Sequence, residues 1–140
     1  MKKTLDEDKI FNKNLMSVCF YTSMTIKSYK DLIVWQKSIT LVRAIYLLTD
    51  NFPKNESYCL SIQMRKATIS IPSNIAEGYG RGKTGDYLKF LRIACGSLYE
   101  LETQLIIAKF LYEKQDYKNI ENLILEIQKM LNSLISKLSS

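Results

Sequence analysis

The side chains that most often perform acid–base, nucleophilic or metal chemistry are missing from this chain or poorly spaced in it. Histidine is absent from all 140 residues, which excludes Ser–His and Cys–His catalytic pairs, histidine metal ligands and imidazole pH switches. Glu100 and Glu102 stand two positions apart, so a helix directs their carboxylates about 160° away from each other. The sequence therefore predicts a protein that is not an enzyme and that holds no metal and no cofactor.

The most conspicuous motif is a glycine-rich stretch over residues 78–85, which reads Gly-Tyr-Gly-Arg-Gly-Lys-Thr-Gly. It does not follow a predicted strand. Gly82, Lys83 and Thr84 also lack the glycine five positions earlier that a phosphate-binding P-loop requires. We interpret the stretch as a loop between two helices and not as a nucleotide site.

Positive charge is the stronger chemical signal. Twenty Lys and Arg side chains outnumber fourteen Asp and Glu, and the resulting formal net charge of +6 attracts polyanions such as RNA and DNA. Tyr79 and Tyr87 stand beside several of these cations and could stack on bases. Solubility and helix pairing are the alternative roles for the charge. The candidate nucleic-acid-binding residues are Arg65, Lys66, Arg81, Lys83, Lys89 and Arg92.

A second polar feature consists of two lines of side chains on the predicted helices that flank the glycine-rich stretch. At 100° per residue, each line occupies a narrow sector of its helix. The first line is Gln63, Lys66, Ser70, Asn74 and Glu77, and the second is Lys89, Arg92, Gly96, Glu100 and Thr103. Such lines form a solvated face, a hydrogen-bonded network between helices, or a surface for a ligand or nucleic acid.

Four helices must position these groups. Apolar residues at three- and four-residue spacing predict helices over about 29–50, 53–76, 86–112 and 116–138. Ser28 and Asp31 have the spacing of a capping box at the start of the domain, and Pro72 predicts a kink. Long helices with short connections pack as antiparallel neighbours. We therefore predict an all-α fold, an antiparallel up-down four-helix bundle over residues 28–140.

Residues 1–27 lack a sustained hydrophobic period. We interpret them as a flexible N-terminal arm, a short accessory helix or an extension upstream of Met24. Cys19, Cys59 and Cys95 have no metal-type spacing, which indicates reduced thiols. No apolar run reaches the ~20 residues of a membrane span, so we expect a cytoplasmic protein with no membrane partner.

Three of the predicted helices carry a second apolar line beside the predicted core face. In the first helix the predicted core face includes Leu32, Trp35, Ile39, Val42 and Tyr46, and the second line repeats every seven residues. Because exposed apolar stripes are a liability for a monomer, they predict a homo-oligomer, with a wider monomeric core as the alternative. The predicted interface residues are Val34, Leu41, Leu48, Ile62, Ile69, Leu88 and Ile106.

The segment over 63–78, Gln-Met-Arg-Lys-Ala-Thr-Ile-Ser-Ile-Pro-Ser-Asn-Ile-Ala-Glu-Gly, resembles a family of small four-helix-bundle proteins encoded in intervening sequences of bacterial 23S rRNA genes. The resemblance continues in Leu-Ile-Val-Trp-Gln over 32–36, Phe-Pro over 52–53 and Ala-Cys-Gly-Ser-Leu-Tyr-Glu-Leu-Glu over 94–102. Lys66 stands where the family often has arginine, which keeps the charge but loses the planar fork. The family-signature residues, which we expect to be structural, are Trp35, Gln63, Ser70, Asn74, Glu77, Gly78, Gly96, Ser97 and Glu100.

The resemblance implies assembly into a homopentamer. It also implies a relation to the accessory protein of diversity-generating retroelements, which is similar in fold and binds a reverse transcriptase and nucleic acid. Two function hypotheses follow. The first is a non-enzymatic oligomer that binds RNA or DNA through its basic residues. The second is a protein–protein interaction scaffold, for example an accessory subunit of a reverse transcriptase or another polymerase.

Overall fold

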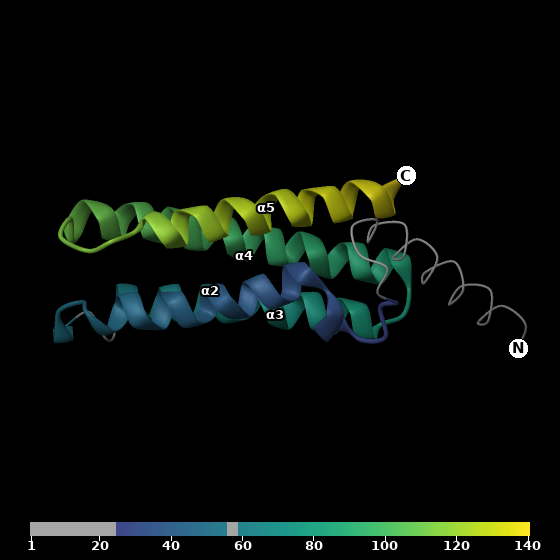
Figure 1. Cartoon of the computed structure of the whole chain (residues 1–140), viewed down its shortest axis with the longest axis horizontal. Coiled ribbons are helices and arrows are strands. Elements are labelled where there is room, and N and C mark those ends of the chain that lie inside the picture. Colours follow the sequence, from purple (N-terminus) through teal and green to yellow (C-terminus); the bar gives the residue numbers. More distant parts are fainter. Residues whose placement is uncertain (1–24, 56–58) are drawn as a thin grey trace, which may run out of the picture.

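The computed structural model describes residues 25–55 and 59–140 and contains four long helices (Figure 1). The short 3-10 helix η1 (Tyr29–Asp31) precedes α2 (Ile33–Asp50), α3 (Leu60–Gly80), α4 (Thr84–Leu111) and α5 (Lys118–Ser139). The predicted capping box is present at η1, where the Asp31 carboxylate accepts a hydrogen bond from the backbone N–H of Ser28 at 2.9 Å.

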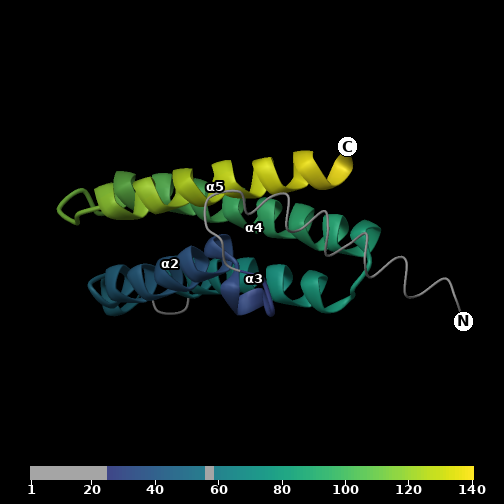
Figure 2. The ribbon, with the colours of Figure 1, turned by 45° about the vertical axis from the view of Figure 1, so that its right-hand side comes forward.

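Successive helices run in opposite directions and each packs on its neighbour in the chain, while α2 also packs on α5. Figure 2 shows the resulting two layers, with α2 and α3 in one layer and α4 and α5 in the other. The prediction of an all-α, antiparallel up-down four-helix bundle is confirmed. Pro72 lies buried inside α3, and the kink expected there stays a prediction.

The ends of α3 differ from the prediction. The helix begins at Leu60 and not after Pro53, and it continues through Gly78 to Gly80. Most of the glycine-rich stretch is therefore helical, and only residues 81–83 connect α3 to α4. Gly82 has a φ of 67°, the left-handed conformation that glycine adopts without strain, and it makes this tight connection possible.

The buried face of α2 is rotated by about 100–130° around the helix from the predicted one, although Leu32, a predicted core residue, is buried. Val34, Leu41 and Leu48, which we predicted to lie in an oligomer interface, are only 6%, 0% and 6% exposed within the single chain. Ile39 and Tyr46, which we predicted to be core residues, are 43% and 37% exposed. The three predicted interface assignments are therefore wrong, and these side chains belong to the core.

Two hydroxyl side chains explain why the α2 core was misread. Ser38 and Thr49 lie on the buried face, so the true core line looks less apolar in the sequence than the outer line does. Each hydroxyl donates to the carbonyl one turn earlier, Ser38 Oγ to Val34 O at 2.6 Å and Thr49 Oγ1 to Ile45 O at 2.8 Å. Because these bonds satisfy the hydroxyls, they can be buried at little cost.

In the other three helices the buried residues follow the three- and four-residue spacing from which the helices were predicted. They include Met64, Ala67, Ile71, Ile75, Ala94, Leu101, Leu105, Ala108, Ile120, Ile127, Leu131, Leu134 and Leu138. Tyr87, Leu91, Leu98 and Ile124 are buried in the same core.

Gly78 controls how closely α3 and α4 approach each other. A Cβ atom at this position would lie 2.6 Å from Cβ of Phe90 and 3.0 Å from Cδ2 of Tyr87. The first of these atoms is attached directly to the backbone of α4, so the helices themselves would have to separate. Gly96 on α4, by contrast, has no neighbour within 4 Å of such an atom.

This contrast predicts opposite effects for the same substitution. Overpacking costs ~1–3 kcal/mol, whereas alanine gains ~1 kcal/mol over glycine inside a helix. We therefore expect Gly78→Ala to lower the free energy of unfolding and Gly96→Ala to raise it, with a difference of about 2 kcal/mol between the variants. Urea denaturation followed by circular dichroism measures both values. Equal effects of the two substitutions would contradict the close contact at Gly78.

Candidate nucleic-acid interface

One end of the bundle gathers cations from four elements. The antiparallel arrangement brings η1, the end of α3, the start of α4 and the end of α5 together at the right of Figure 1. Four of the predicted nucleic-acid-binding residues lie at or near this end, together with three lysines that the sequence analysis missed. This basic end consists of Lys27, Lys30, Arg81, Lys83, Lys89, Arg92 and Lys137.

The three missed lysines are distant in sequence from the glycine-rich stretch. Lys27 and Lys30 precede the first long helix, and Lys137 lies in the last turn of α5. The signal that identifies them is the topology, because an up-down bundle places the start of its first helix and the end of its fourth beside the connection between its second and third.

The cations of the basic end differ in how strongly they are held. A salt bridge joins Arg81 Nη2 to Glu77 Oε1 at 3.2 Å, and the Arg81 guanidinium lies 5.3 Å from the centre of the Phe90 ring. Lys83, Lys89 and Arg92 are exposed and make no ion pair within the described residues. Lys27, Lys30 and Lys137 are likewise exposed and appear in no ion pair of the described residues, so six of the seven cations are free to contact phosphate groups.

Three carboxylates lie among the seven cations of this end. Asp31 uses one oxygen, Oδ2, to accept hydrogen bonds from the backbone N–H groups of Lys27 and Ser28, both at 2.9 Å. Glu77 pairs with Arg81, and Asp86 lies exposed in the first turn of α4. These carboxylates offset part of the charge, and the excess of cations attracts anions.

Arg65 and Lys66 lie elsewhere on the bundle. Arg65 precedes Arg81 by sixteen residues, about 24 Å along the helix axis. Its guanidinium donates from Nε to Thr49 Oγ1 at 2.8 Å and from Nη2 to Asp50 Oδ1 at 2.7 Å, and lies 4.4 Å from the centre of the Tyr46 ring. Arg65 therefore links α3 to α2, whereas Lys66 is exposed beside it.

The two tyrosines that could have stacked on bases are engaged in packing. Tyr87 is fully buried, so its predicted availability is wrong. Tyr79 is half-buried, with its ring centre 6.3 Å from that of Tyr87 and 6.4 Å from that of Tyr29. Burial, reinforced by the charge of Asp31, raises the pKa of the Tyr79 hydroxyl, which therefore stays protonated.

The polar line on α3 contacts α4 at Ser97, which lies beside the predicted line on α4 and is not a member of it. Ser70 Oγ and Ser97 Oγ lie 2.8 Å apart, and Asn74 Nδ2 donates to the carbonyl of Ser70 at 2.8 Å and to its hydroxyl at 2.9 Å. These three family-signature residues form a hydrogen-bonded network between helices. Gln63 and Glu100 are exposed on either side of it, so the rest of the two lines is a solvated face.

Two of the three cysteines lie in the part of the chain that the structure describes. Cys59 is exposed and Cys95 is half-buried, and both are free. Burial raises the pKa of the Cys95 thiol, which disfavours the reactive thiolate. Cys19 lies outside the described residues. Within 25–55 and 59–140, no group of three Cys, Asp or Glu side chains is placed to hold a metal ion, and no helix is long and apolar enough to cross a membrane.

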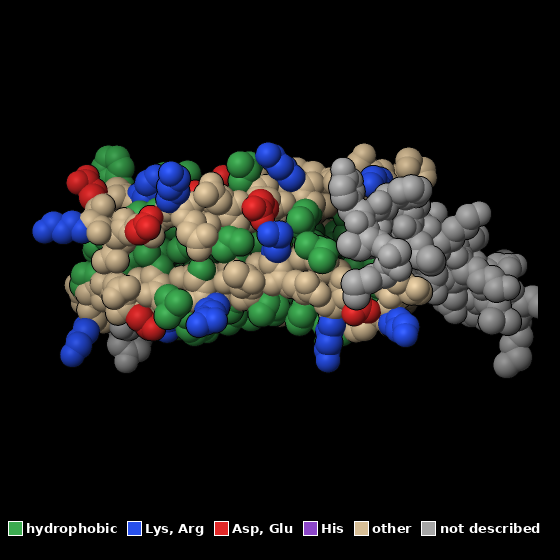
Figure 3. Space-filling model, viewed as in Figure 1, with side chains coloured by type: hydrophobic (Ala, Val, Ile, Leu, Met, Phe, Trp, Pro, Cys, Tyr) green, Lys and Arg blue, Asp and Glu red, His purple; other side chains and the backbone are tan. Residues whose placement is uncertain are grey.

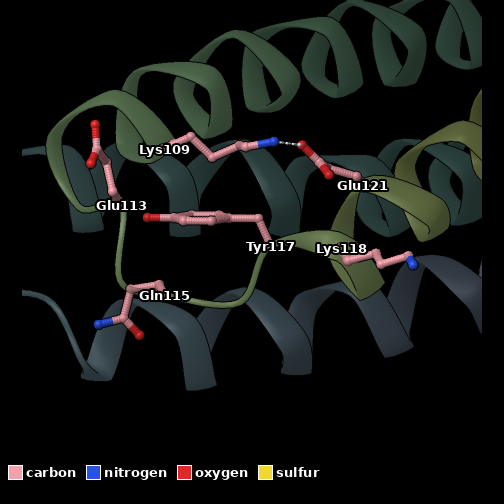
Figure 4. Close-up of a pocket in the computed structure, with 6 residues that line it drawn as sticks. All are labelled: Lys109, Glu113, Gln115, Tyr117, Lys118 and Glu121. Atoms are coloured by element: carbon pink, nitrogen blue, oxygen red, sulfur yellow. Dashed lines mark hydrogen bonds and ion pairs between the residues drawn. The ribbon is translucent and has the colours of Figure 1, made fainter.

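The opposite end of the bundle contains an open cavity of about 500 Å³ between α4 and α5. Figure 4 shows its lining, in which Lys109 pairs with Glu121 above the ring of Tyr117. The Tyr117 hydroxyl lies 3.0 Å from the carbonyl oxygen of Ala108 and 2.8 Å from that of Tyr112, and burial raises its pKa. These contacts anchor the connection between the two helices.

Two exposed apolar strips run along the sides of the bundle. The first, here called the α2–α3 strip, comprises Ile39 and Tyr46 on α2 and Ile62 and Ile69 on α3. It flanks the contact between Arg65 and Tyr46, because Ile62 lies three residues before Arg65 and Ile69 lies four residues after it. Ile62 and Ile69 are exposed, as the interface prediction requires. Apolar side chains are visible along the lower margin of Figure 3, where α2 and α3 form the surface.

The second, the α4–α5 strip, flanks the Lys109–Glu121 pair in the same way. Ile106 lies three residues before Lys109, and Leu125 lies four residues after Glu121. The strip comprises Tyr99, Ile106 and Phe110 on α4 and Leu125 on α5, and Phe110 is 86% exposed. Leu88, another predicted interface residue, is only half-exposed and packs against the core. Because α2 and α3 form one layer and α4 and α5 the other (Figure 2), the two strips belong to opposite layers of the bundle.

The Arg65 contact predicts a stabilising role for this side chain. The exposure of Asp50 weakens the ion pair, so the hydrogen bond to Thr49 and the ring of Tyr46 carry most of the effect. Arg65→Lys keeps the charge but loses the planar fork, and we expect it to lower the free energy of unfolding by about 1 kcal/mol. Lys66→Ala, at the exposed neighbouring position, is the control and should change it by less than about 0.5 kcal/mol. Equal effects in urea denaturation would contradict the assignment.

Comparisons with known proteins bear on this arrangement. The family model described as 23S rRNA-intervening sequence protein matches residues 30–133. The chain is also similar to the crystal structure of a protein with unknown function from the S23 ribosomal protein family of Bacteroides thetaiotaomicron. The two are 27% identical with a TM-score of 0.65, and the match covers 74% of this chain and 98% of that chain. No curated protein matches the chain.

Proposed function

Because this chain belongs to the 23S rRNA-intervening sequence protein family, we propose that it works as a non-enzymatic bundle that binds RNA or DNA at its basic end and assembles with copies of itself. The observation that supports binding is the convergence of cations at one end from η1, the α3–α4 connection, α4 and α5, with Lys83, Lys89 and Arg92 free of ion pairs among the described residues. Such a surface contacts phosphate groups without reading base sequence.

The electrostatic origin of this binding predicts its salt dependence. Neutralising a phosphate releases condensed counterions, so each lost contact flattens the plot of log affinity against log salt by about 0.7–0.9. We expect Lys83→Ala with Lys89→Ala to flatten the slope by about 1.4–1.8 for an RNA hairpin and for duplex DNA. Fluorescence anisotropy across a series of salt concentrations measures the slope.

The matched control removes the same charge from the other end of the bundle. Lys114→Ala with Lys118→Ala should leave the slope as it is in the parent chain. Equal slopes for both double variants, or no binding at about 50 mM salt, would contradict a nucleic-acid role for the basic end. A protein retained by the immobilised chain after nuclease treatment would instead favour the scaffold hypothesis.

Self-assembly is the second part of the proposal, and the resemblance to the family suggests a pentamer. The two exposed strips support it, because a monomer would leave both in water. Strips on opposite sides of one chain fit head-to-tail contacts, in which the α2–α3 strip of one copy meets the α4–α5 strip of the next. Such heterologous contacts close into rings when the rotation between copies permits.

Head-to-tail contact predicts that two assembly-defective variants complement each other. Ile69→Glu disables the α2–α3 strip and Ile106→Glu disables the α4–α5 strip, so each variant alone should stay monomeric. An equimolar mixture still contains one intact strip of each kind, and we expect heterodimers that grow no further. Sedimentation velocity distinguishes these species.

Two results would argue against head-to-tail contact. A mixture that stays monomeric at concentrations where the parent chain assembles indicates like-with-like pairing of strips. A parent chain that is monomeric throughout contradicts self-assembly itself.

A further inference from the structure

We propose that Tyr29 is a positioning residue of the basic end, which docks η1 onto the bundle so that Lys27 and Lys30 contact the same polyanion as the cations of α4. This inference rests on the proposed nucleic-acid binding and extends it, because it gives an aromatic side chain a role among the cations. The juxtaposition that supports it is the Tyr29 ring packed between α2 and α3, with exposed lysines before and after it in the sequence.

The Tyr29 ring joins two helices at this end. Its centre lies 5.3 Å from that of Trp35 at the start of α2 and 6.4 Å from that of Tyr79 near the end of α3. The Tyr79 ring in turn lies 6.3 Å from that of buried Tyr87 in the first turn of α4. All three contacts are edge to face, the arrangement that aromatic pairs favour. A series of ring contacts therefore connects η1, through α3, to the start of α4.

The residues around Tyr29 separate into a packed pair and an exposed pair. Ile26 and Tyr29 are half-buried and pack against the core. Lys27 and Lys30 are exposed. Docking of the packed pair on the core leaves both lysines in the solvent, at the end of the bundle where α3 connects to α4 (Figure 1).

Hydrogen bonds fix the backbone of both lysines. The N–H of Lys27 donates to Asp31 Oδ2 at 2.9 Å. The N–H of Lys30 donates to Ser28 Oγ at 3.3 Å. The carbonyl of Lys30 accepts from Gln36 Nε2 at 2.8 Å, which ties η1 to the first turn of α2. The two lysine side chains thus extend from a backbone that is ordered before any ligand binds.

A fixed backbone matters because the cations of this surface come from separate parts of the chain. Lys83 and Lys89 are placed by α4 and its connection to α3, whereas Lys27 and Lys30 precede the first long helix. If η1 were detached, a polyanion bound at α4 would recruit these two lysines only by ordering their segment, and such ordering lowers affinity. With η1 docked by Tyr29, the ordering takes place during folding and not during binding.

The test measures binding of duplex DNA and of an RNA hairpin by fluorescence anisotropy, for the full chain and its variants. Tyr29→Ala removes the ring, and we expect it to weaken binding about tenfold, the effect of ordering one or two side chains on binding. Tyr29→Phe keeps the ring and should bind like the parent chain. Circular dichroism should show the same helix content for all three chains, because Tyr29 belongs to none of the four long helices.

Trp35 reports whether η1 is docked. It is the only tryptophan in the sequence, and its ring contacts that of Tyr29. We expect stronger acrylamide quenching of Trp35 in the Tyr29→Ala chain than in the parent chain or the Tyr29→Phe chain. Gln36→Ala is a second variant, because exposed Gln36 holds the Lys30 carbonyl without belonging to the core. It should weaken binding in the same direction as Tyr29→Ala.

A double-mutant cycle separates positioning from a general loss of stability. In the parent chain, Lys27→Ala with Lys30→Ala should weaken binding. In the Tyr29→Ala chain the same pair should have a smaller effect, because the two lysines are no longer held at the surface. Lys83→Ala with Lys89→Ala is the matched control, since α4 places these lysines independently of η1. It should weaken binding by the same factor in both chains.

The possible results distinguish this inference from the proposed function. Equal effects of the Lys27 and Lys30 substitutions in both chains overturn the positioning role, as does a Tyr29→Ala chain that binds as tightly as the parent chain. Either result leaves the nucleic-acid binding itself in place, because the parent chain still binds. A parent chain that binds neither ligand at about 50 mM salt contradicts the proposed function and this inference with it.

Discussion

The missing side chain at Gly78 is the constraint on which the rest of the structure depends. With Cβ of Phe90 occupying the space where a Gly78 side chain would be, α3 and α4 approach closely beside a connection of only residues 81–83. The hydrogen bond between Ser70 and Ser97 joins the same two helices farther along. This pair sets the antiparallel direction, and α2 and α5 then pack on it and on each other. The basic end exists because this connection brings Arg81, Lys83 and Lys89 to it.

The fold class could be predicted from the sequence because each helix needs only one apolar side, whichever neighbours it packs against, and this produces a hydrophobic period of three to four residues. Three of the four core faces could be predicted for this reason, but α2 could not. Its buried face contains Ser38 and Thr49, whose hydroxyls are satisfied by carbonyls of their own helix, so polarity in the sequence does not indicate exposure there. The end of α3 was misplaced for a related reason. Glycine lowers helix propensity, yet Gly78 is required within the helix by its contact with α4.

The residues of the candidate site could be predicted where they are close together in the sequence. They could not be predicted where the topology or a side-chain contact determines whether a cation is available at the basic end. Lys83, Lys89 and Arg92 cluster in the sequence and are exposed in the structure. Arg65 has the same charge, but Thr49 and Asp50 accept its hydrogen bonds and its guanidinium lies over the ring of Tyr46. No local pattern reveals partners that are fifteen to nineteen residues away. Lys137 is the converse case. It is far from Lys83 in the sequence, and the up-down topology places it at the same end of the bundle.

In the assembly proposed above, the placement of the strips relative to the basic end would link self-association to nucleic-acid binding. Both strips run along the sides of the bundle, whereas the basic end is its tip, so copies associating through the strips lie side by side and leave the tips free. In a head-to-tail ring, all copies point in the same direction. In the proposed ring the basic ends would share one rim, where several weak phosphate contacts would act on one polyanion at high effective concentration. Contact between unlike strips would thus bury both strips and gather the basic ends on one face.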